Sequence, residues 1–177
     1  MNLKERQGLT LIYTGEGKGK TTAALGLLLR AWGNGLRVGC IQFIKSPERV
    51  VGERVALEKI GVPLMTAGKG FIFDPCDRDE HYAAAQEAWE LARREIMSGN
   101  YDLLVLDEIT YLLNFGWIET DHFVAWLKEN KPKNLHLVLT GRDAPEALIN
   151  YADTVSEVRE VKHHYHAGIE AQSGIEF

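Results

Sequence analysis

The chain alternates between short apolar runs and longer segments with a helical pattern. Each apolar run has the length of a β-strand and is bounded by glycine or polar residues, which is typical of strands inside a sheet. We predict six strands, over residues 9–14, 37–45, 62–67, 101–108, 135–140 and 153–158. We predict helices between them, over residues 20–32, 49–60, 77–98, 119–129 and 144–152.

The segment after residue 77 carries the clearest helical pattern. Ala85, Trp89, Ala92 and Ile96 recur at spacings of four, three and four residues, so they share one face of a helix. Gly99 follows this pattern and supplies a stop signal. The pattern therefore predicts a long helix that packs its apolar face against a core.

Strands that alternate with helices predict a mostly parallel central sheet flanked by helices, which is an α/β fold. Since no linker or repeat interrupts the pattern, we predict one domain over residues 1–177. It would have a short N-terminal arm at 1–8 and a C-terminal tail at 159–177. Ligands of such sheets bind outside the carboxyl ends of the strands.

Composition disfavours several classes of protein. The net charge of −5 argues against nonspecific nucleic-acid binding, which needs a basic surface, but it is compatible with a local basic pocket for a small anion. Two cysteines, Cys40 and Cys76, are too few for a disulfide scaffold. No apolar run reaches the about 20 residues of a membrane span, and the start "MNLKERQG" has no signal-peptide core. We expect a cytoplasmic protein that binds neither nucleic acid nor membrane.

The stretch "YTGEGKGKTTAALG" (13–26) nearly matches the phosphate-binding pattern G-x-x-x-x-G-K-[ST]. The first glycine of that pattern would fall at position 14, where the chain has Thr14. Glycines stand instead at Gly15, Gly17 and Gly19. They would let successive backbone N–H groups turn towards an anion, and the helix that follows would add its positive end.

The residues after these glycines carry the charge and hydroxyl groups of such a loop. Lys20 would supply a positive charge to a polyphosphate, Thr21 a hydroxyl for Mg²⁺, and Thr22 a second hydroxyl. A glycine-rich turn that only caps the helix is the alternative.

Two acids end the predicted strand "LLVLDE", and a phosphate-binding loop needs such a partner. Asp107 or Glu108 can hold Mg²⁺, directly or through water. An acid at this place can also simply cap the next helix.

Basic residues follow other strands. Arg142 in "TGRD" falls at the carboxyl edge of the sheet and can reach a polyphosphate, although a surface arginine in a turn is the alternative. Lys45 ends the predicted strand 37–45 and could reach a phosphate in the same way. Arg30 would lie on a solvated helix face. In "ENKPKN", Lys133 stands where the guanine-reading N-K-x-D pattern needs an aspartate, which disfavours a GTPase.

Together these segments resemble a known family. "TGEGKGKTTAALG", "IQFIK", "LVLDEITY", "TGRD", "DTVSEV" and "VKHHYHAGIEAQSGIEF" are similar, in wording and order, to the P-loop ATP:corrinoid adenosyltransferases. The resemblance implies a P-loop NTPase-like (RecA-like) fold. It also implies transfer of the 5′-deoxyadenosyl group of ATP to cob(I)alamin or another corrinoid, with triphosphate as the leaving group, in adenosylcobalamin biosynthesis or salvage.

The resemblance also implies roles for particular residues. Mg²⁺ would lie near Thr21 and Glu108, with Asp107 beside them, and Lys20 and Arg142 would act in catalysis. The assignment of Arg30 to the nucleotide rests on the resemblance alone. The implied nucleotide-binding residues are Thr14, Gly15, Glu16, Gly17, Lys18, Gly19, Lys20, Thr21, Thr22, Arg30 and Arg142.

Members of this family press a Phe-x-Trp pair against the corrin face. "GFIF" aligns with that pair and gives Phe71 and Phe73, of which Phe73 replaces the usual Trp. Phenylalanine keeps an apolar plane but loses area and the indole N–H. Read without the family, the two rings would pack within their own loop.

The resemblance further implies a homodimer and an electron donor, such as a flavodoxin or a flavin reductase. The tail contains His163, His164 and His166, which could form a metal site. We favour instead a tail near the nucleotide pocket or a solvated segment.

Two other functions remain open from the residues. A P-loop kinase or ATPase would use Glu108 to orient an acceptor or water and would release ADP. A nucleotide-gated corrinoid carrier would show negligible turnover.

Overall fold

The computed structural model describes residues 7–43, 51–67 and 78–176. Lys45, Phe71, Phe73 and Cys76 therefore lie outside the described residues. The described strands are β1 (Thr10–Thr14), β2 (Val38–Gln42), β3 (Leu64–Thr66), β4 (Leu103–Asp107), β5 (His136–Thr140) and β6 (Thr154–Glu157). All six predicted strands are found.

The helices that the structure describes include every one that the sequence predicted, together with two that it missed. They are α1 (Lys20–Gly33), α2 (Gly52–Lys59), α3 (Arg78–Met97), α4 (Thr110–Asn114), α5 (Thr120–Asn130), α6 (Glu146–Tyr151) and the 3₁₀-helix η2 (His164–Ala167). The missed elements, α4 and η2, are too short to show a helical period.

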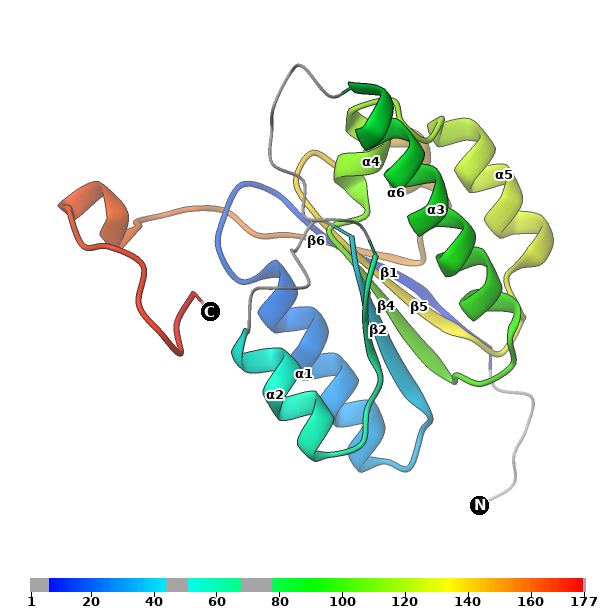
Figure 1. Cartoon of the computed structure of the whole chain (residues 1–177), viewed down its shortest axis with the longest axis horizontal. Coiled ribbons are helices and arrows are strands. Elements are labelled where there is room, and N and C mark those ends of the chain that lie inside the picture. The colour runs from blue at the N-terminus through cyan, green and yellow to red at the C-terminus, as the bar shows by residue number, and fades with distance from the viewer. Residues whose placement is uncertain (1–6, 44–50, 68–77, 177) are drawn as a thin grey trace.

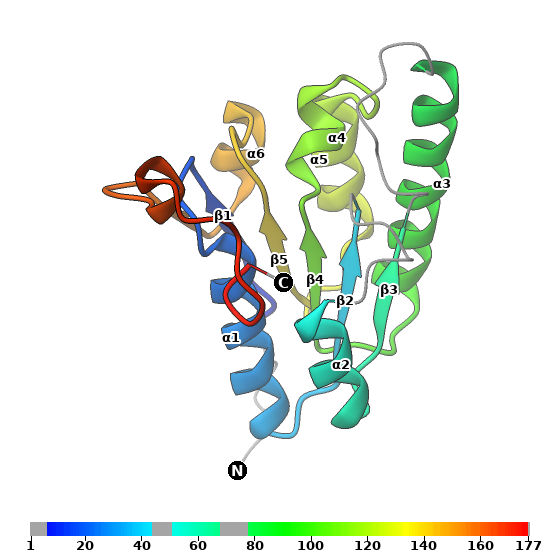
Figure 2. The same ribbon diagram turned by 60° about the vertical axis from the view of Figure 1, so that its left-hand side comes forward.

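The strands form one sheet in the order β3-β2-β4-β5-β1-β6, and every pairing in the described part of the chain is parallel. Figures 1 and 2 show α1 and α2 on one side of this sheet and α3, α4 and α5 on the other. The predicted α/β fold is therefore confirmed.

Central strands are apolar along their whole length because both faces of the sheet are covered. In β4, Leu104 and Leu106 belong to the core under α3, α4 and α5, whereas Leu103 and Val105 belong to the core under α1 and α2. The edge strand β6 is mostly exposed, which explains its weaker apolar signal.

The predicted apolar face of α3 lies in the larger core. Ala85, Trp89, Ala92 and Ile96 are all buried. The helix ends just before Gly99, whose φ of 70° is in the left-handed region that glycine adopts easily. Both the face and the end of this helix are as the sequence predicted.

Helix α5 begins with an unusual cap. The Glu119 carboxylate accepts hydrogen bonds from the backbone N–H groups of Asp121 and His122. These bonds favour the charged form, so they lower the pKa of Glu119.

Parallel pairing brings the carboxyl ends of four strands to one edge of the sheet. Register pairs Gln42 at the end of β2 with Asp107 at the end of β4, and Tyr13 in β1 with Thr140 at the end of β5. These polar residues follow buried apolar runs, so they meet at one edge. In the described part of the chain, no helix has both the length and the apolar character to cross a bilayer.

We predict that Gly39→Ala lowers the free energy of unfolding by about 1–3 kcal/mol, because an added methyl group overpacks the core. A Cβ on Gly39 would lie 2.5 Å from Cε1 of the Tyr101 ring, which is half-buried beneath β2. Urea unfolding would measure the change. The matched control is Gly26→Ala in α1, where a Cβ meets nothing within 4 Å. Alanine should stabilise that helix by up to about 1 kcal/mol, and equal stability of the two variants would contradict the prediction.

Candidate functional site

The glycine-rich loop connects β1 to α1 and packs against the chain that leaves β6. Gly17 N donates to the Val158 carbonyl at 2.7 Å, and Val158 N donates to the Thr14 carbonyl at 2.8 Å. A Cβ on Gly17 would lie 2.7 Å from the Arg159 carbonyl carbon, and one on Gly15 would lie 2.6 Å from the Val158 oxygen. Two of the three glycines are therefore required by the close approach of this segment.

The third glycine is required by its own backbone. Gly19 has a φ of 116°, and a Cβ built on it would meet nothing within 4 Å. This conformation is closed to residues with a side chain, and it places Gly19 as the N-cap of α1. The N–H groups of the first turn of α1 are thus left available to an anion.

Thr14 stands where the usual pattern has its first glycine, and its side chain has a structural role there. It ends β1, it is buried, and its Oγ1 accepts a hydrogen bond from Ala144 N at 3.0 Å. Thr14 therefore supports the loop after β5 from behind.

The Lys20 ammonium group closes the glycine-rich loop. It donates to the carbonyl oxygens of Gly15 at 2.6 Å and Gly17 at 2.8 Å. Burial lowers the pKa of Lys20, and the nearby positive charge of Arg142 lowers it further. The lysine is thus held at the floor of the loop, where its charge is less solvated than on an open surface.

A buried carboxylate joins three of the strand ends to α1. Asp107 Oδ1 accepts from Thr21 Oγ1 at 2.9 Å and from Thr140 Oγ1 at 2.7 Å, and its Oδ2 accepts from Gln42 Nε2 at 3.1 Å. Asp107 is fully buried. Gln42 and Thr140 were not singled out from the sequence, although a polar residue that ends a buried strand is a usable signal.

Glu108 differs from Asp107 because it faces outward. Its φ of 66° is rare for a residue with a side chain, and its backbone N–H donates to Thr140 Oγ1 at 2.8 Å. This turn directs the Glu108 side chain to the lining of a cavity. The two acids left open by the sequence thus have different surroundings: Asp107 organises hydroxyl groups, whereas Glu108 reaches the cavity.

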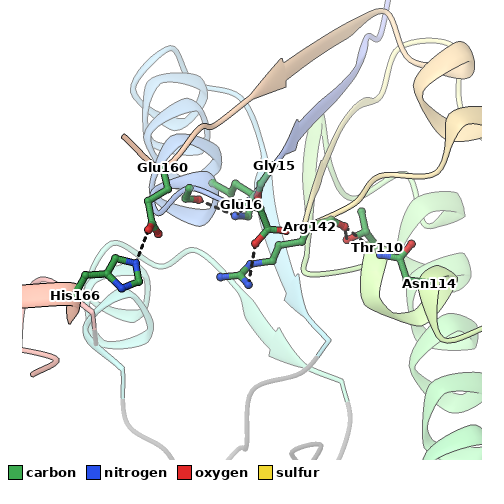
Figure 3. A network of polar contacts seen from close by, with 9 residues as sticks. Gly15, Glu16, Thr110, Asn114, Arg142, Glu160 and His166 are labelled. Atoms are coloured by element: carbon green, nitrogen blue, oxygen red, sulfur yellow. Dashed lines mark hydrogen bonds and ion pairs between the residues drawn. The ribbon is translucent and has the colours of Figure 1, made fainter. Parts of the chain in front are cut away.

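Arg142 approaches the glycine-rich loop from the opposite side. Figure 3 shows its guanidinium group pointing towards Glu16, with which it forms an ion pair at 3.1 Å. Its carbonyl oxygen accepts hydrogen bonds from Thr110 Oγ1 at 2.7 Å and from Asn114 Nδ2 at 3.1 Å. Two residues of α4 therefore fix the backbone that carries this arginine.

These parts surround a cavity of about 730 Å³, which is within the range of small-molecule sites. The side of the cavity along α1 is apolar, with Leu25 and Leu29, and Ile175 adds an apolar group from the tail. The lining residues are Glu16, Gly17, Lys18, Gly19, Lys20, Thr21, Thr22, Leu25, Gly26, Leu29, Gly52, Glu53, Glu108, Tyr111, Thr140, Gly141, Arg142, Glu160, His163, Gly174, Ile175 and Glu176.

The C-terminal tail forms one wall of this cavity. Glu176 is ion-paired with Lys18 at 3.2 Å and with His164 Nε2 at 3.3 Å. Nearer the start of the tail, Glu160 contacts His166 Nε2 at 2.8 Å, as Figure 3 shows. The tail is therefore near the glycine-rich loop, which is one of the two arrangements that the sequence left open, although most of its residues are also exposed.

One group in the tail has the composition of a metal site. Ligand atoms of His163, His164 and Glu176 lie within 4.8 Å of one another. However, His163 Nδ1 accepts a hydrogen bond from Tyr165 N at 3.1 Å, which caps η2. A neutral ring that accepts at Nδ1 carries its proton on Nε2, so Nε2 could bind a metal only if this cap were lost.

The structure brings most of the predicted site residues together. The residues behind the cavity are Thr14, Gly15 and Asp107, and those that line it are Glu16, Gly17, Lys18, Gly19, Lys20, Thr21, Thr22, Glu108 and Arg142.

Arg30 is the exception. It is exposed in the last turn of α1 and lines a separate cavity of about 340 Å³ with Leu9 and His136, at the opposite edge of the sheet. Within this chain, about three helical turns separate Arg30 from the glycine-rich loop, and its assignment to the nucleotide stays a prediction.

Comparison with known proteins identifies this arrangement. Residues 6–177 match the family described as ATP:corrinoid adenosyltransferase BtuR/CobO/CobP. The chain is 39% identical to the corrinoid adenosyltransferase of Escherichia coli (strain K12) over 176 residues, which covers 98% of this chain and 88% of that protein. It is 40% identical to the corrinoid adenosyltransferase of Sinorhizobium sp. (98% and 82% covered) and 38% identical to corrinoid adenosyltransferase CobA of Salmonella typhimurium (98% and 88% covered). The chain therefore belongs to the ATP:corrinoid adenosyltransferase family, and it is a transferase whose substrates are ATP and a corrinoid.

Proposed function

We propose that this transferase moves the 5′-deoxyadenosyl group of ATP to the cobalt(I) centre of a corrinoid and releases triphosphate. The observation that carries the proposal is the glycine-rich loop, whose lysine and the facing Arg142 share one cavity at the carboxyl edge of the sheet. In this reaction the loop holds the leaving triphosphate, so the sugar carbon points away from it.

Binding of the polyphosphate requires Lys18 and Arg142 to exchange partners. Both are now paired with carboxylates, Lys18 with Glu176 and Arg142 with Glu16. These pairs are at least partly exposed, and exposed ion pairs contribute only about 0–1 kcal/mol. A multiply charged phosphate chain can therefore displace the carboxylates with little loss of stability.

The oxygen groups near Thr21 fit a magnesium ion. Mg²⁺ prefers oxygen ligands and keeps several waters, and the Thr21 hydroxyl and the Glu108 carboxylate both line the cavity. Asp107, behind them, accepts the Thr21 hydroxyl proton in a hydrogen bond, which leaves the Thr21 oxygen lone pairs directed elsewhere. Thr21 and Glu108 would hold the ion, with Asp107 orienting Thr21, and the ion would neutralise charge on the phosphates.

The transfer needs no general base from the protein. The cobalt(I) electron pair forms the bond to C5′ while the C5′–O bond breaks, and triphosphate leaves with that bonding pair. The loop N–H groups, Lys20 and Arg142 would stabilise the negative charge that develops on the leaving oxygen. Holding C5′ beside the corrinoid would remove much of the entropic barrier.

Family membership favours this chemistry over a kinase or ATPase reaction at the γ-phosphate, and over a carrier with negligible turnover. Product analysis separates the three. Anaerobic incubation with ATP, Mg²⁺ and a chemically reduced corrinoid should yield adenosylcorrinoid and triphosphate. Formation of ADP would contradict the proposal, as would the absence of any product.

Three further features belong to the proposal. Phe71 and Phe73 would press against the corrin face, with support only from their match to the family's aromatic pair. Cobalt(I) must be generated by reduction, so an electron donor such as a flavodoxin or a flavin reductase is required. We also place the protein in the cytoplasm as a homodimer, as expected from its sequence and family.

We predict that Lys20→Ala lowers kcat/KM for adenosylation by at least about 100-fold, because a cation is removed from the leaving group. The melting temperature should change little. The matched control is Lys131→Ala, since Lys131 is also partly buried, donates to a loop carbonyl (Gly8 O, 3.3 Å) and has its pKa lowered by burial. Wild-type activity of Lys20→Ala would exclude this lysine from the reaction.

We predict that Thr140→Val destabilises the protein by about 1–3 kcal/mol and also lowers activity. The substitution keeps the shape of the side chain but removes the hydroxyl that joins Asp107 to the Glu108 N–H. Denaturant unfolding and adenosylation kinetics measure the two effects. Thr154→Val, on the exposed edge strand, is the control that should leave both unchanged. If Thr140→Val behaves like this control, the network does not position Glu108.

A further inference from the structure

A row of aromatic rings leads away from the cavity, from α4 to the first turn of α3. The Tyr111 and Phe115 rings are stacked with centroids 6.2 Å apart, and the Phe115 and Trp117 centroids are 4.8 Å apart. Trp117 in turn stacks on His81 at 5.9 Å. We call these four residues the aromatic ladder.

The backbone fixes the ladder in place. Tyr111 and Phe115 are separated by four positions, at the start and C-cap of α4, so they share one side of this helix. Gly116, with a φ of 67°, turns the chain out of the helix, and Gln86 Nε2 donates to the Trp117 carbonyl at 2.6 Å. The ladder thus bridges α4 and the first turn of α3, which Figure 1 shows side by side.

The members of the ladder differ in their surroundings. Trp117 packs against the hydrophobic core, whereas Phe115 is 42% exposed. Tyr111 lines the cavity beside the glycine-rich loop, and burial raises the pKa of its hydroxyl. A single exposed aromatic residue is ordinary, but here an exposed ring joins a ring in the cavity wall to a ring of the core.

The chemistry of the reaction says what this surface can bind. The cobalt must reach C5′, so the corrin ring has to lie at the mouth of the nucleotide cavity. The corrin ring is a broad, nearly flat macrocycle, and aromatic side chains offer flat apolar faces for such a ligand. The loop and the tail carry charges at this cavity, with Lys18 and Glu16 on the loop and Glu160 and Glu176 on the tail, and the apolar side along α1 offers the aliphatic Leu25 and Leu29 in place of flat rings.

We propose, on the basis of the function proposed above, that the aromatic ladder is the platform on which the corrin ring of the substrate lies. Phe115 contacts the macrocycle, and Tyr111 lies between the macrocycle and the nucleotide. Trp117 and His81 support Phe115 from behind. Phe115 therefore determines corrinoid affinity without affecting the binding of ATP.

The test measures corrinoid and nucleotide affinities separately. Phe115→Ala is titrated anaerobically with cob(II)alamin in the presence of saturating MgATP, and ATP binding is measured without corrinoid. We expect the corrinoid Kd to rise about tenfold, which corresponds to about 1.4 kcal/mol, while the ATP Kd and the melting temperature stay at wild-type values. Phe115→Tyr should bind the corrinoid as tightly as the wild type because it keeps the ring. Phe115→Leu should bind it more weakly than the wild type.

Trp32→Ala provides a matched control. Trp32 is also 42% exposed, but it lies near the end of α1, at the opposite edge of the sheet. The Trp32→Ala variant should bind cob(II)alamin with the affinity of the wild type. Wild-type corrinoid affinity of Phe115→Ala would overturn the platform, as would an equal loss in Trp32→Ala or a parallel loss of ATP binding.

The outcome for the wild-type protein separates the two levels of the argument. If the wild type forms adenosylcorrinoid and triphosphate but Phe115→Ala retains its corrinoid Kd, the platform is wrong and the proposed function stands. If the wild type binds no corrinoid, both are wrong.

Discussion

The geometry of the site depends on one buried carboxylate. Asp107 accepts hydrogen bonds from the first turn of α1 and from the ends of β2 and β5, so it holds together elements that are far apart in sequence. Removing a carboxylate from water costs several kcal/mol, and hydrogen bonds to a charged group return about 1.5–3 kcal/mol each. The desolvation cost of Asp107 and the free energy of its hydrogen bonds therefore nearly cancel. The main effect of the network is to fix the position of Thr21 relative to the strand ends.

Placement of the other groups follows from this constraint. Thr140, which is bonded to Asp107, accepts a hydrogen bond from the Glu108 backbone N–H. Glu108 then lines the cavity, whereas Asp107 does not. Thr110 and Asn114 hold the carbonyl of Arg142 in the same way. The side chains to which we assign catalysis and binding are thus positioned through their backbones, and under the proposed function their charged ends would change partners when a polyphosphate enters.

Much of this could be predicted from sequence, because strand and helix periods are local signals. The apolar face of α3 and the end of this helix at Gly99 were readable from spacing and composition. The roles of Thr14, Gly15 and Gly17 were not, since their explanation is contact with Val158 and Arg159, more than a hundred residues away. The ladder was missed because α4 is a single short turn. Arg30 shows another limit: the resemblance assigned it to the nucleotide, whereas within this chain it lies at a separate cavity, so that assignment stays a prediction.

The position of β1 has a consequence for synthesis on the ribosome. This first strand pairs with β5 and β6, the last two to be made, and the loop after it packs on the chain beyond β6. Nascent β1 therefore has no neighbour in the sheet until nearly the whole polypeptide has emerged, and long-range pairing of this kind is slow. The contacts of the glycine-rich loop with Val158 can form only at that stage, so under the proposed function nucleotide binding would wait until the chain beyond β6 has been made.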